Sequence, residues 1–563
     1  MRPPHAYSVP YSPYVVSQSF WKGASMTEVS KPRTAADAQE RTAGPTPHPQ
    51  RWLILSTLCL AVMLVLLDNT VLTVAIPSMT ESLGASTSQI QWVMNGYTLA
   101  VGGLLMTTGS LADRIGRRRA LLIGVVLFTL CSGVASMADN PAQLIAGRIG
   151  MGVGAALLMP STLAVLMQVF DEKERPKAIG VWTGVAAAAV ALGPVLGGFM
   201  LDHFWWGSVL LINVPVGLVA LISMIILVPE SRDPKVRRTD VPGVVLSILM
   251  SVGLVYAIIS VPEHGWNSAQ TLIPFVVGAT ALISFTYWER RCEEPMLDVA
   301  LFRNPAFSGA VGSTALTYLA LSGSLFLFTQ YLQFVLDYSP LEAGIGVVPM
   351  ALALMMMTPF GPKLAEKIGT PGTMATGLAV MGLGLVTLSF LDQGSGYSLS
   401  LAGLAVMGAG AGIAMPTAST ALVSAIPVER AGVAGGLNST MQEFGSACGV
   451  AVMGSLAAGL FASRLPDAVP DEATHSIGQA LGVAAAGEDP SQLVEQVRDA
   501  FVSGFSASMR IGAAAAVAAG VVAWALLRRN SVPPQEAATQ SDEATAQVPG
   551  PGAEKTPDTT GVS

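Results

Sequence analysis

Apolar stretches long enough to cross a lipid bilayer recur along this chain, and they decide what it can fold into. A helix needs about 20 mostly apolar residues to span the hydrocarbon core. Because 51% of the residues are hydrophobic and only 12% are charged, a soluble globule is excluded. The sequence predicts an all-α polytopic membrane protein with fourteen transmembrane helices, at 52–76, 90–110, 120–138, 142–168, 178–200, 208–228, 241–260, 271–288, 307–330, 343–361, 373–391, 398–421, 433–461 and 505–527.

Basic residues predict how the chain is oriented, because short loops rich in Lys and Arg stay in the cytoplasm. One alternating set of loops contains most of them, beginning with Arg114, Arg117, Arg118 and Arg119. The opposite set has only Arg464 and Arg498, with Arg510 at its rim. We therefore expect a plasma-membrane protein with both termini cytoplasmic. Residues 1–50 and 529–563 are expected to be disordered cytoplasmic tails, and Met26 is a second candidate start.

Several function classes are disfavoured by what the sequence lacks. The net charge of -7 argues against a nucleic-acid partner. We find no G-x-x-x-x-G-K-[ST] string for binding a nucleotide, and the four Cys and five His residues show no metal-ligand spacing. An enzyme should show clustered catalytic groups, and a receptor should show a sizeable extramembrane domain. We expect no enzyme, no cofactor and no metal, and a proton gradient as the energy source.

Two internal repeats predict the arrangement of the helices. L-A-D-R-I-G at 111–116 returns as L-A-E-K-I-G at 364–369, and M-G-V-G-A-A-L-L-M-P at 151–160 returns as M-G-A-G-A-G-I-A-M-P at 407–416. Both copies are displaced by eight spans. The simplest explanation is an N-terminal six-helix bundle at 51–230, two inserted helices with a linker at 231–300, and a C-terminal six-helix bundle at 301–528. Within the last, 462–504 is predicted to form an extracellular helical hairpin, unless it is a loop without function.

Five motifs then resemble those of the major facilitator superfamily. G-S-L-A-D-R-I-G-R-R-R (109–119) resembles its signature loop, R-I-G-M-G-V-G-A-A (148–156) its fourth-span motif, and G-V-A-A-A-A-V-A-L-G-P-V-L-G-G (184–198) its antiporter motif. L-D-N-T-V-L-T-V-A-I-P (67–77) and I-N-V-P (212–215) are similar to the fourteen-span drug:proton antiporters. The resemblance covers about 50–528. It implies the major facilitator fold, with substrate bound near the midplane between halves that rock.

Three ionisable residues lie within predicted spans, where charge is costly and indicates function. Asp68 and Arg148 are at similar depths in the first and fourth spans, so they could meet. The resemblance implies that Arg148 takes part in proton transfer, and its repeat counterpart is the uncharged Leu404. The alternatives are that Arg148 extends to the outer surface and that Asp68 is a structural hydrogen-bonding group. Deprotonated Asp68 could attract a cationic substrate, or its protonation could reset the carrier.

Glu443 is near the midplane of the 433–461 span and is the third candidate for proton coupling. Facing the cavity, it would supply a counter-charge for a lipophilic cation. The alternative is an acid that hydrogen-bonds to Asn438, Gln442 or a neighbouring helix and has no transport role. Other candidate cavity residues are Gln330, Tyr331 and Gln333, at the end of the ninth span, and Met355 in the tenth. Methionine suits surfaces that accept substrates of many shapes. The alternative for the methionines is that they only fill space against lipid.

The repeated loops are predicted to act as a conformational gate. A carboxylate at a helix end can bind an arginine or a helix N-terminus in one state only. The resemblance implies this role for Gly109, Asp113, Gly116 and Arg117 in the first copy and, more weakly, for Glu366, Lys367 and Gly369 in the second. Small residues permit close helix approach, and we assign this role to the antiporter-motif residues Gly184, Gly193, Pro194, Gly197 and Gly198.

The function expected from these residues is proton-coupled export by alternating access. The predicted substrates are lipophilic, cationic drugs or antibiotics, and the other partners are protons and the lipid bilayer. The alternatives are an exporter dedicated to one endogenous metabolite, lipid or siderophore, which the same motifs fit, and a membrane receptor or enzyme.

Overall fold

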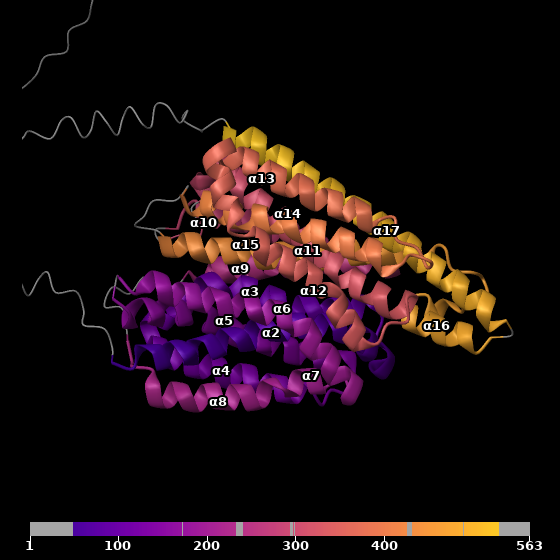
Figure 1. Ribbon diagram of the computed structural model, residues 1–563, viewed down its shortest axis with the longest axis horizontal. Coiled ribbons are helices and arrows are strands. Elements are labelled where there is room, and N and C mark those ends of the chain that lie inside the picture. The colour runs from indigo at the N-terminus through magenta and orange to yellow at the C-terminus, as the bar shows by residue number, and fades with distance from the viewer. Residues whose placement is uncertain are drawn as a thin grey trace, which may run out of the picture. The chain divides into compact units, whose positions relative to one another are not determined.

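The computed structural model describes residues 49–528, apart from 172, 232–239, 293, 294, 296, 298, 425–430 and 488. Within that part of the chain every regular element is a helix, as the sequence predicts (Figure 1). The predicted tails lie outside the described residues, save for Pro49 and Gln50.

The N-terminal half is one group of packed helices. In this half α3 and α4 pack on α5, and α2 packs on α6 and α8. Asn140 begins α5, because its side chain accepts the Gln143 backbone N–H and Pro141 fills the first helical position. The helices are α2 (Arg51–Leu83), α3 (Thr87–Ile115), α4 (Arg117–Ala135), α5 (Pro141–Val169), α6 (Arg175–His203), α7 (Ser208–Leu211) and α8 (Asn213–Leu227).

The C-terminal half is a second group. Here α11 packs on α15 and α17, α13 on α14 and α17, and α12 on α14. A short 3-10 helix, η1 (Val299–Arg303), precedes it, and a π-helical turn, η2 (Tyr331–Val335), extends α11. The helices are α11 (Pro305–Gln330), α12 (Pro340–Met357), α13 (Phe360–Leu388), α14 (Tyr397–Ser424), α15 (Ala431–Ala462), α16 (Ile477–Ala485) and α17 (Pro490–Arg528), with the 3-10 turn η4 (Asp471–Ala473) before α16.

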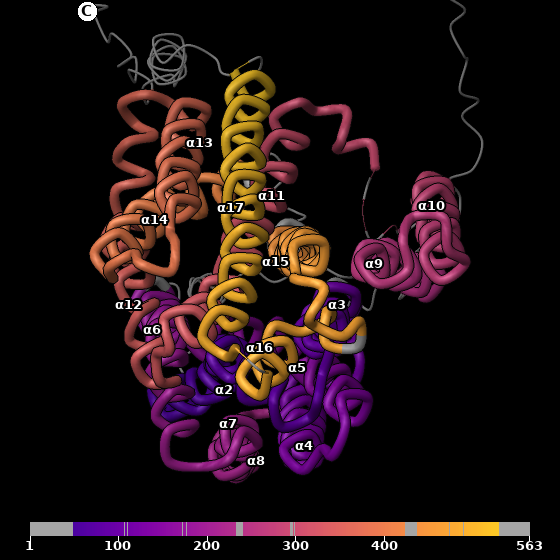
Figure 2. Tube along the Cα trace, turned by 90° about the vertical axis from the view of Figure 1, so that its right-hand side faces the viewer, coloured from indigo at the N-terminus to yellow at the C-terminus, as the bar shows by residue number. Residues whose placement is uncertain are grey.

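The two helices between the halves, α9 (Val241–His264) and α10 (Ala269–Glu289), pack on each other. Figure 2 shows α10 on the outside, with α9 between it and α3 and α15. Val255 and Ile259 of α9 share an apolar cluster with Leu99 of α3 and with Ala447 and Ala451 of α15. The inserted pair therefore touches both halves where α3 meets α15.

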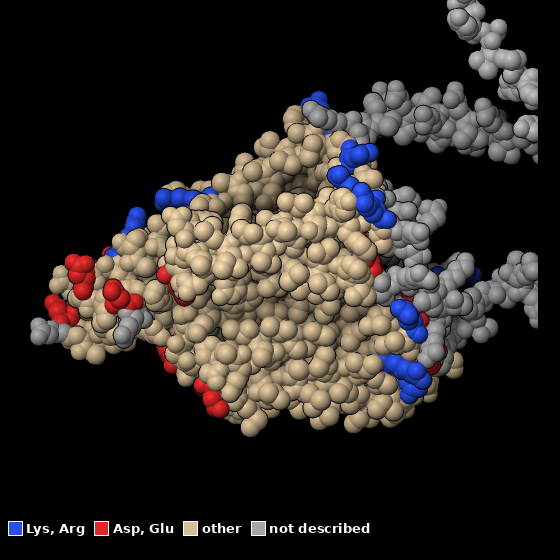
Figure 3. Space-filling model, turned by 180° about the vertical axis from the view of Figure 1, so that it is seen from behind, with Lys and Arg blue, Asp and Glu red and all other residues tan. Residues whose placement is uncertain are grey.

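The helices have the length and composition of membrane spans. In the described residues, thirteen helical stretches meet both criteria. The 29-residue α3 is long enough but is not among them. Figure 3 shows, on one face, a wide band without charged side chains. Lys and Arg gather on one side of this band, and Asp and Glu with a few basic side chains on the other. The count of fourteen spans stays a prediction.

The helix bundle has two distinct ends. The basic end is where α3 turns into α4 at Gly116, and the hairpin end is where α16 lies.

The helical hairpin predicted at 462–504 is only partly correct. The second predicted short helix is not separate, because α17 continues from Pro490 to Arg528 as one helix of 39 residues.

The two repeated hexapeptides adopt the same backbone turn. Gly116 has a backbone φ of 106° and Gly369 one of 76°, values that residues other than glycine rarely adopt. The first copy ends α3, whereas the second lies inside α13, which is bent at Gly369. The repeat seen in the sequence is therefore also a repeat of local structure.

Candidate functional site

Asp68 and Arg148 form an ion pair inside the N-terminal half. Arg148 Nη1 on α5 lies 2.5 Å from Asp68 Oδ2 on α2, and both side chains are fully buried. The contact between Asp68 and Arg148 that their similar depths led us to expect is confirmed. Arg148 does not extend to the surface, so that alternative is wrong in this structure.

Neighbouring helices hold the acid of this pair in place. Asn213 Nδ2 on α8 donates to Asp68 Oδ1 at 2.7 Å and lies 3.0 Å from Ser132 Oγ on α4. Ser132 donates in turn to the Leu210 carbonyl at 2.8 Å. Asn213 belongs to the I-N-V-P string, whose individual residues we assigned no role. Nothing in the sequence singled out Ser132.

The guanidinium has its own set of contacts. Arg148 Nε donates to the Val93 carbonyl at 3.3 Å, and its central carbon lies 4.3 Å from the Tyr97 ring centre. Arg148 Nη2 has no hydrogen-bond partner among the described residues. A buried arginine with a single acid partner becomes an uncompensated charge when that acid is neutralised. Among the described residues, Asp68 is therefore the one acid that balances the buried guanidinium.

Glu443 faces the other half of the protein. It lies on α15 opposite Gly102 of α3, where a Cβ on the glycine would be 3.0 Å from the Glu443 Cβ. No donor or cation contacts its carboxylate within the described part of the chain, and neither Asn438 nor Gln442 bonds to it. Tyr97 lies within electrostatic reach of Glu443 as well as of the ion pair. Glu443 is thus an unpaired acid between the halves.

The residues of the first predicted gate bond to one another and to the segment that follows α8. Asp113 Oδ1 accepts from Arg117 Nε at 2.9 Å, and the Arg117 backbone N–H donates to the Ser231 carbonyl at 2.9 Å. A Cβ on Gly116 would collide with the carboxylate of Glu230, so only glycine fits this turn. Gly109, also predicted in this gate, faces Pro160 of α5.

The second predicted gate makes fewer contacts. Glu366 and Lys367 are exposed, and neither forms an ion pair with another described residue. Gly369 keeps its turn conformation. The second copy thus repeats the glycine turn of the first but not its ion pair.

Three of the four antiporter-motif glycines lie where helices approach closely, whereas the role predicted for Gly184 is wrong in this structure. A Cβ on Gly193 or Gly197 of α6 would meet Thr70 or Val71 of α2, and one on Gly198 would meet Pro340 and Leu341 of α12. Pro194 presents its carbonyl oxygen to Gly344 of α12, so tightly that a Cβ there would collide. Gly344 is a close-packing residue that the sequence analysis missed.

The same face of α6 is open toward the basic end. Gly184 lies 14 residues, or about four turns, before Gly198 and on the same side of the helix. A Cβ at Gly184 or Gly180 would have nothing within 4 Å. The α6–α12 contact is a seam between the two halves; it is tight near the hairpin end, whereas the face of α6 at Gly180 and Gly184 is open.

Comparison with known proteins now decides the family. Residues 58–450 match the sequence model of the Major Facilitator Superfamily. The chain belongs to this superfamily. It is 36% identical over 417 residues to the multidrug resistance protein Stp of Mycobacterium tuberculosis, covering 73% of this chain and 78% of that protein. It is 33% identical to the multidrug efflux pump LfrA of Mycolicibacterium smegmatis, covering 87% and 99%.

A solved structure supports the fold of this superfamily member. The bacterial homologue of the human lysosomal transporter Spinster, in its inward-facing and unoccupied conformation, aligns with a TM-score of 0.63 at 18% identity. The alignment covers 87% of this chain and all of the other. Membership and fold identify the chain as a multi-pass membrane transporter rather than an enzyme. Among the described residues no cluster of His, Cys, Asp or Glu could hold a metal ion.

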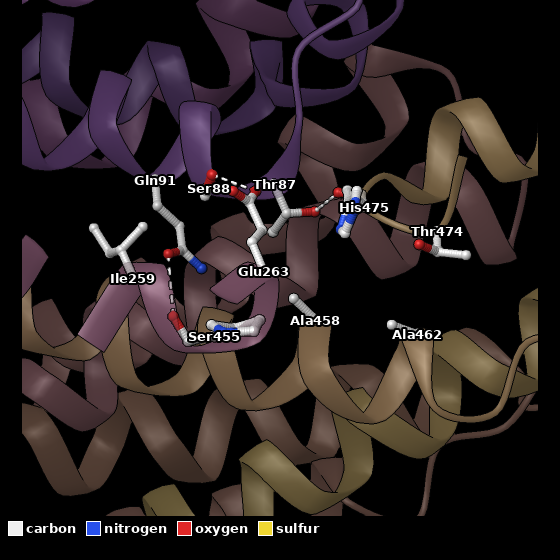
Figure 4. Close-up of a pocket in the computed structure, with 11 residues that line it drawn as sticks. Thr87, Ser88, Gln91, Ile259, Glu263, Ser455, Ala458, Ala462, Thr474 and His475 are labelled. Carbon is white, nitrogen blue, oxygen red and sulfur yellow. Dashed lines mark hydrogen bonds between the residues drawn. The ribbon is translucent and has the colours of Figure 1, made fainter. Parts of the chain in front are cut away.

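The hairpin end of this transporter is held shut by polar contacts among the two halves and α9 (Figure 4). The Thr87 backbone N–H and Oγ1 of α3 donate to the His475 carbonyl at 2.9 and 2.8 Å. Ser88 Oγ donates to Glu263 Oε1 of α9 at 2.6 Å. These groups surround a pocket of only about 10 Å³, room for one water.

Three of the four additional predicted cavity residues lie in helix packing instead. Tyr331 is fully buried, and its hydroxyl donates to the Asp392 carbonyl at 2.7 Å. Gln330 bonds to the Phe326 carbonyl of its own helix, and Gln333 Nε2 donates to the Val74 carbonyl of the N-terminal half at 2.9 Å. In this conformation Gln333 therefore helps to close the hairpin end.

Met355, the remaining residue of that group, is on α12 and 40% exposed. Its exposure is compatible with contact either with substrate or with lipid.

Closure at the hairpin end gives a first prediction. We expect Gly344→Ala to slow transport roughly 10-fold, because overpacking of this kind costs about 1–3 kcal/mol and disfavours the state with the seam closed. Efflux of a fluorescent substrate from cells measures the rate. The matched control is Gly180→Ala on α6, where the added methyl meets open space. Equal effects of the two variants would contradict the assignment of a tight seam.

A second prediction concerns Glu263. Glu263→Ala should expose the hairpin end about 3-fold more often, since it removes an acceptor for Ser88 worth roughly 0.5–1.5 kcal/mol. Glu263→Gln should behave like the wild type, because its amide oxygen still accepts. The measurement is the labelling rate of a cysteine placed by Ala458→Cys, using a membrane-impermeant maleimide. The same rate in both Glu263 variants would show that this hydrogen bond does not hold the seam.

Proposed function

We propose that this transporter is a proton-coupled antiporter that exports lipophilic, cationic drugs or antibiotics. The observation that supports this most is the fully buried Asp68–Arg148 pair, in which no other described acid binds the arginine. Ionisable groups in a membrane interior are costly and mark ion or substrate pathways. Relatives named as multidrug resistance and multidrug efflux proteins favour drugs as the substrates.

The proposed orientation places the basic end in the cytoplasm, with both termini there. The hairpin end is then extracellular, and the conformation described above faces inward, ready to receive substrate. In this proposal α3 is the fourteenth span. The domains are the bundles 51–230 and 301–528, the inserted pair within 231–300, and the tails 1–50 and 529–563.

The proposed cycle uses the two acids separately. Asp68 receives a proton from outside, which releases Arg148 from its only acid partner and favours reorganisation of α2 against α5. Loss of the proton to the cytoplasm restores the pair. Glu443, unpaired between the halves, balances the charge of a cationic substrate. Asp113 and Arg117 latch the basic end in one state, and the glycines of α6 close the opposite end.

The test is transport by purified protein in sealed vesicles. Ethidium should accumulate only when a pH gradient is imposed, and an internal pH indicator should report proton movement in the opposite direction. Accumulation that ignores the gradient would overturn proton coupling. A panel of biocides, dyes and antibiotics separates the two substrate hypotheses, because a dedicated metabolite exporter should transport none of them.

A further inference from the structure

A pocket between α2 and α6 opens near the basic end and lies apart from the ion pair. Its volume is about 450 Å³, large enough for several fused rings. None of its lining residues is Lys, Arg, Asp or Glu. The lining residues are Trp52, Leu55, Ser56, Cys59, Leu60 and Met63 of α2 and Val181 and Val185 of α6.

The position of these residues on α2 shows which way the pocket faces. Ser56 and Val74 are 18 residues, or five helical turns, apart and lie on the same side of the helix. Val74 meets the C-terminal half through its carbonyl, which accepts from Gln333. Beside the pocket, Gly184 and Gly180 of α6 have open space around them. The pocket therefore lies in the N-terminal wall of the space between the halves, on the side where the face of α6 is open.

Trp52 is held in place at the basic end of this pocket. Its ring packs edge-on against Phe170, with 5.2 Å between ring centres. Arg51 next to it is bound to Glu174 at 2.5 Å, which fastens the start of α2 to the connection between α5 and α6. Because Trp52 is 37% exposed and already oriented, it can stack on a flat ligand with little loss of side-chain entropy.

Charge decides what kind of ring fits. The Lys177 ammonium lies 5.1 Å from the centre of the Trp52 ring, so it occupies one face of the indole, and its charge repels a cation on the other face. No lining carboxylate offsets this repulsion. A neutral ring pays no such cost and gains contact with Met63 and Cys59, whose sulfur atoms are polarizable.

We propose that this pocket binds the uncharged aromatic ring portion of the exported substrate, whose cationic group lies elsewhere in the cavity. The proposal rests on the proposed export function and adds a ring-binding subsite on Trp52. It predicts selection by ring size and by absence of charge on the ring.

The experiment is equilibrium binding to the purified full-length protein in lipid nanodiscs, with empty nanodiscs subtracted. The probe is N-phenyl-1-naphthylamine, a neutral fluorescent aromatic compound. We expect Trp52→Leu to weaken its binding roughly 10-fold and Val185→Trp, which fills the pocket, to abolish it. Leu53→Ala, at an exposed neighbour that does not line the pocket, should change affinity less than about 2-fold. Monodisperse elution on size exclusion confirms that each variant is folded.

Two results would overturn the subsite. One is unchanged probe binding in both Trp52→Leu and Val185→Trp; the other is displacement of the probe from this pocket by ethidium, whose ring system is itself cationic. Because binding is measured without a gradient, failure of proton-driven export would leave a positive binding result intact. Conversely, export with normal ring selectivity in Val185→Trp would reject the subsite and keep the antiporter.

Discussion

Asp68→Asn is expected to reduce gradient-driven export by roughly 100-fold or more. Asparagine can still accept a hydrogen bond, but it cannot balance the Arg148 charge or carry the proton. Arg148 would then be a buried cation with no acid partner, at a cost of about 3–5 kcal/mol. The measurement is ethidium transport into vesicles under an imposed pH gradient, with proton movement recorded in parallel.

This variant needs a control for stability, because an unpaired buried arginine destabilises the fold as well. Asp68→Asn combined with Arg148→Gln removes both charges and should recover thermal stability while transport stays absent. Asp139→Asn, at an exposed acid beyond α4, should transport normally. Gradient-dependent transport by the double variant would contradict a coupling role for the pair and leave it a structural ion pair.

The ion pair could be predicted from sequence because its evidence is local. Each span can be located from its apolar residues, and the helical rise then gives the depth of Asp68 and Arg148. The shared turn at Gly116 and Gly369 was also predictable, since the repeat preserves a glycine at each. In both cases the residue type itself is the signal: charge within hydrocarbon, and glycine within a repeated motif.

The remaining partners depend on which helix faces lie together, which one sequence does not record. Asn213 is 145 positions from Asp68, and an amide in a membrane helix is not unusual enough to attract notice. Gly344 matters only because the Pro194 carbonyl lies against it. Tyr331 was a candidate cavity residue from its position at the end of the ninth predicted span, yet its hydroxyl donates to the Asp392 carbonyl. Helix packing decides each of these cases.

Glu443→Gln is expected to reduce export of cationic substrates roughly 100-fold while neutral aromatic substrates lose less than about 3-fold. The carboxylate is the unpaired acid on α15 between the halves, and a cation about 4 Å away gains on the order of 4 kcal/mol from it at an effective dielectric of 20, part of which its desolvation offsets. Glutamine has nearly the same shape, so packing against Gly102 of α3 is kept. Efflux rates of ethidium and of N-phenyl-1-naphthylamine are measured in the same cells, and the ratio of cationic to neutral export is compared between the variant and the wild type.

Glu81→Gln is the matched control, since Glu81 is an exposed acid near the hairpin end of α2 and should affect neither substrate. A counter-charge acts only on the charged substrate, whereas a proton-coupling acid acts on every substrate that the gradient drives. Equal loss of both substrates in Glu443→Gln would therefore assign Glu443 to proton coupling together with Asp68. Selective loss of the cation would separate the two acids, with the pair at Arg148 coupling protons and the unpaired acid recognising charge.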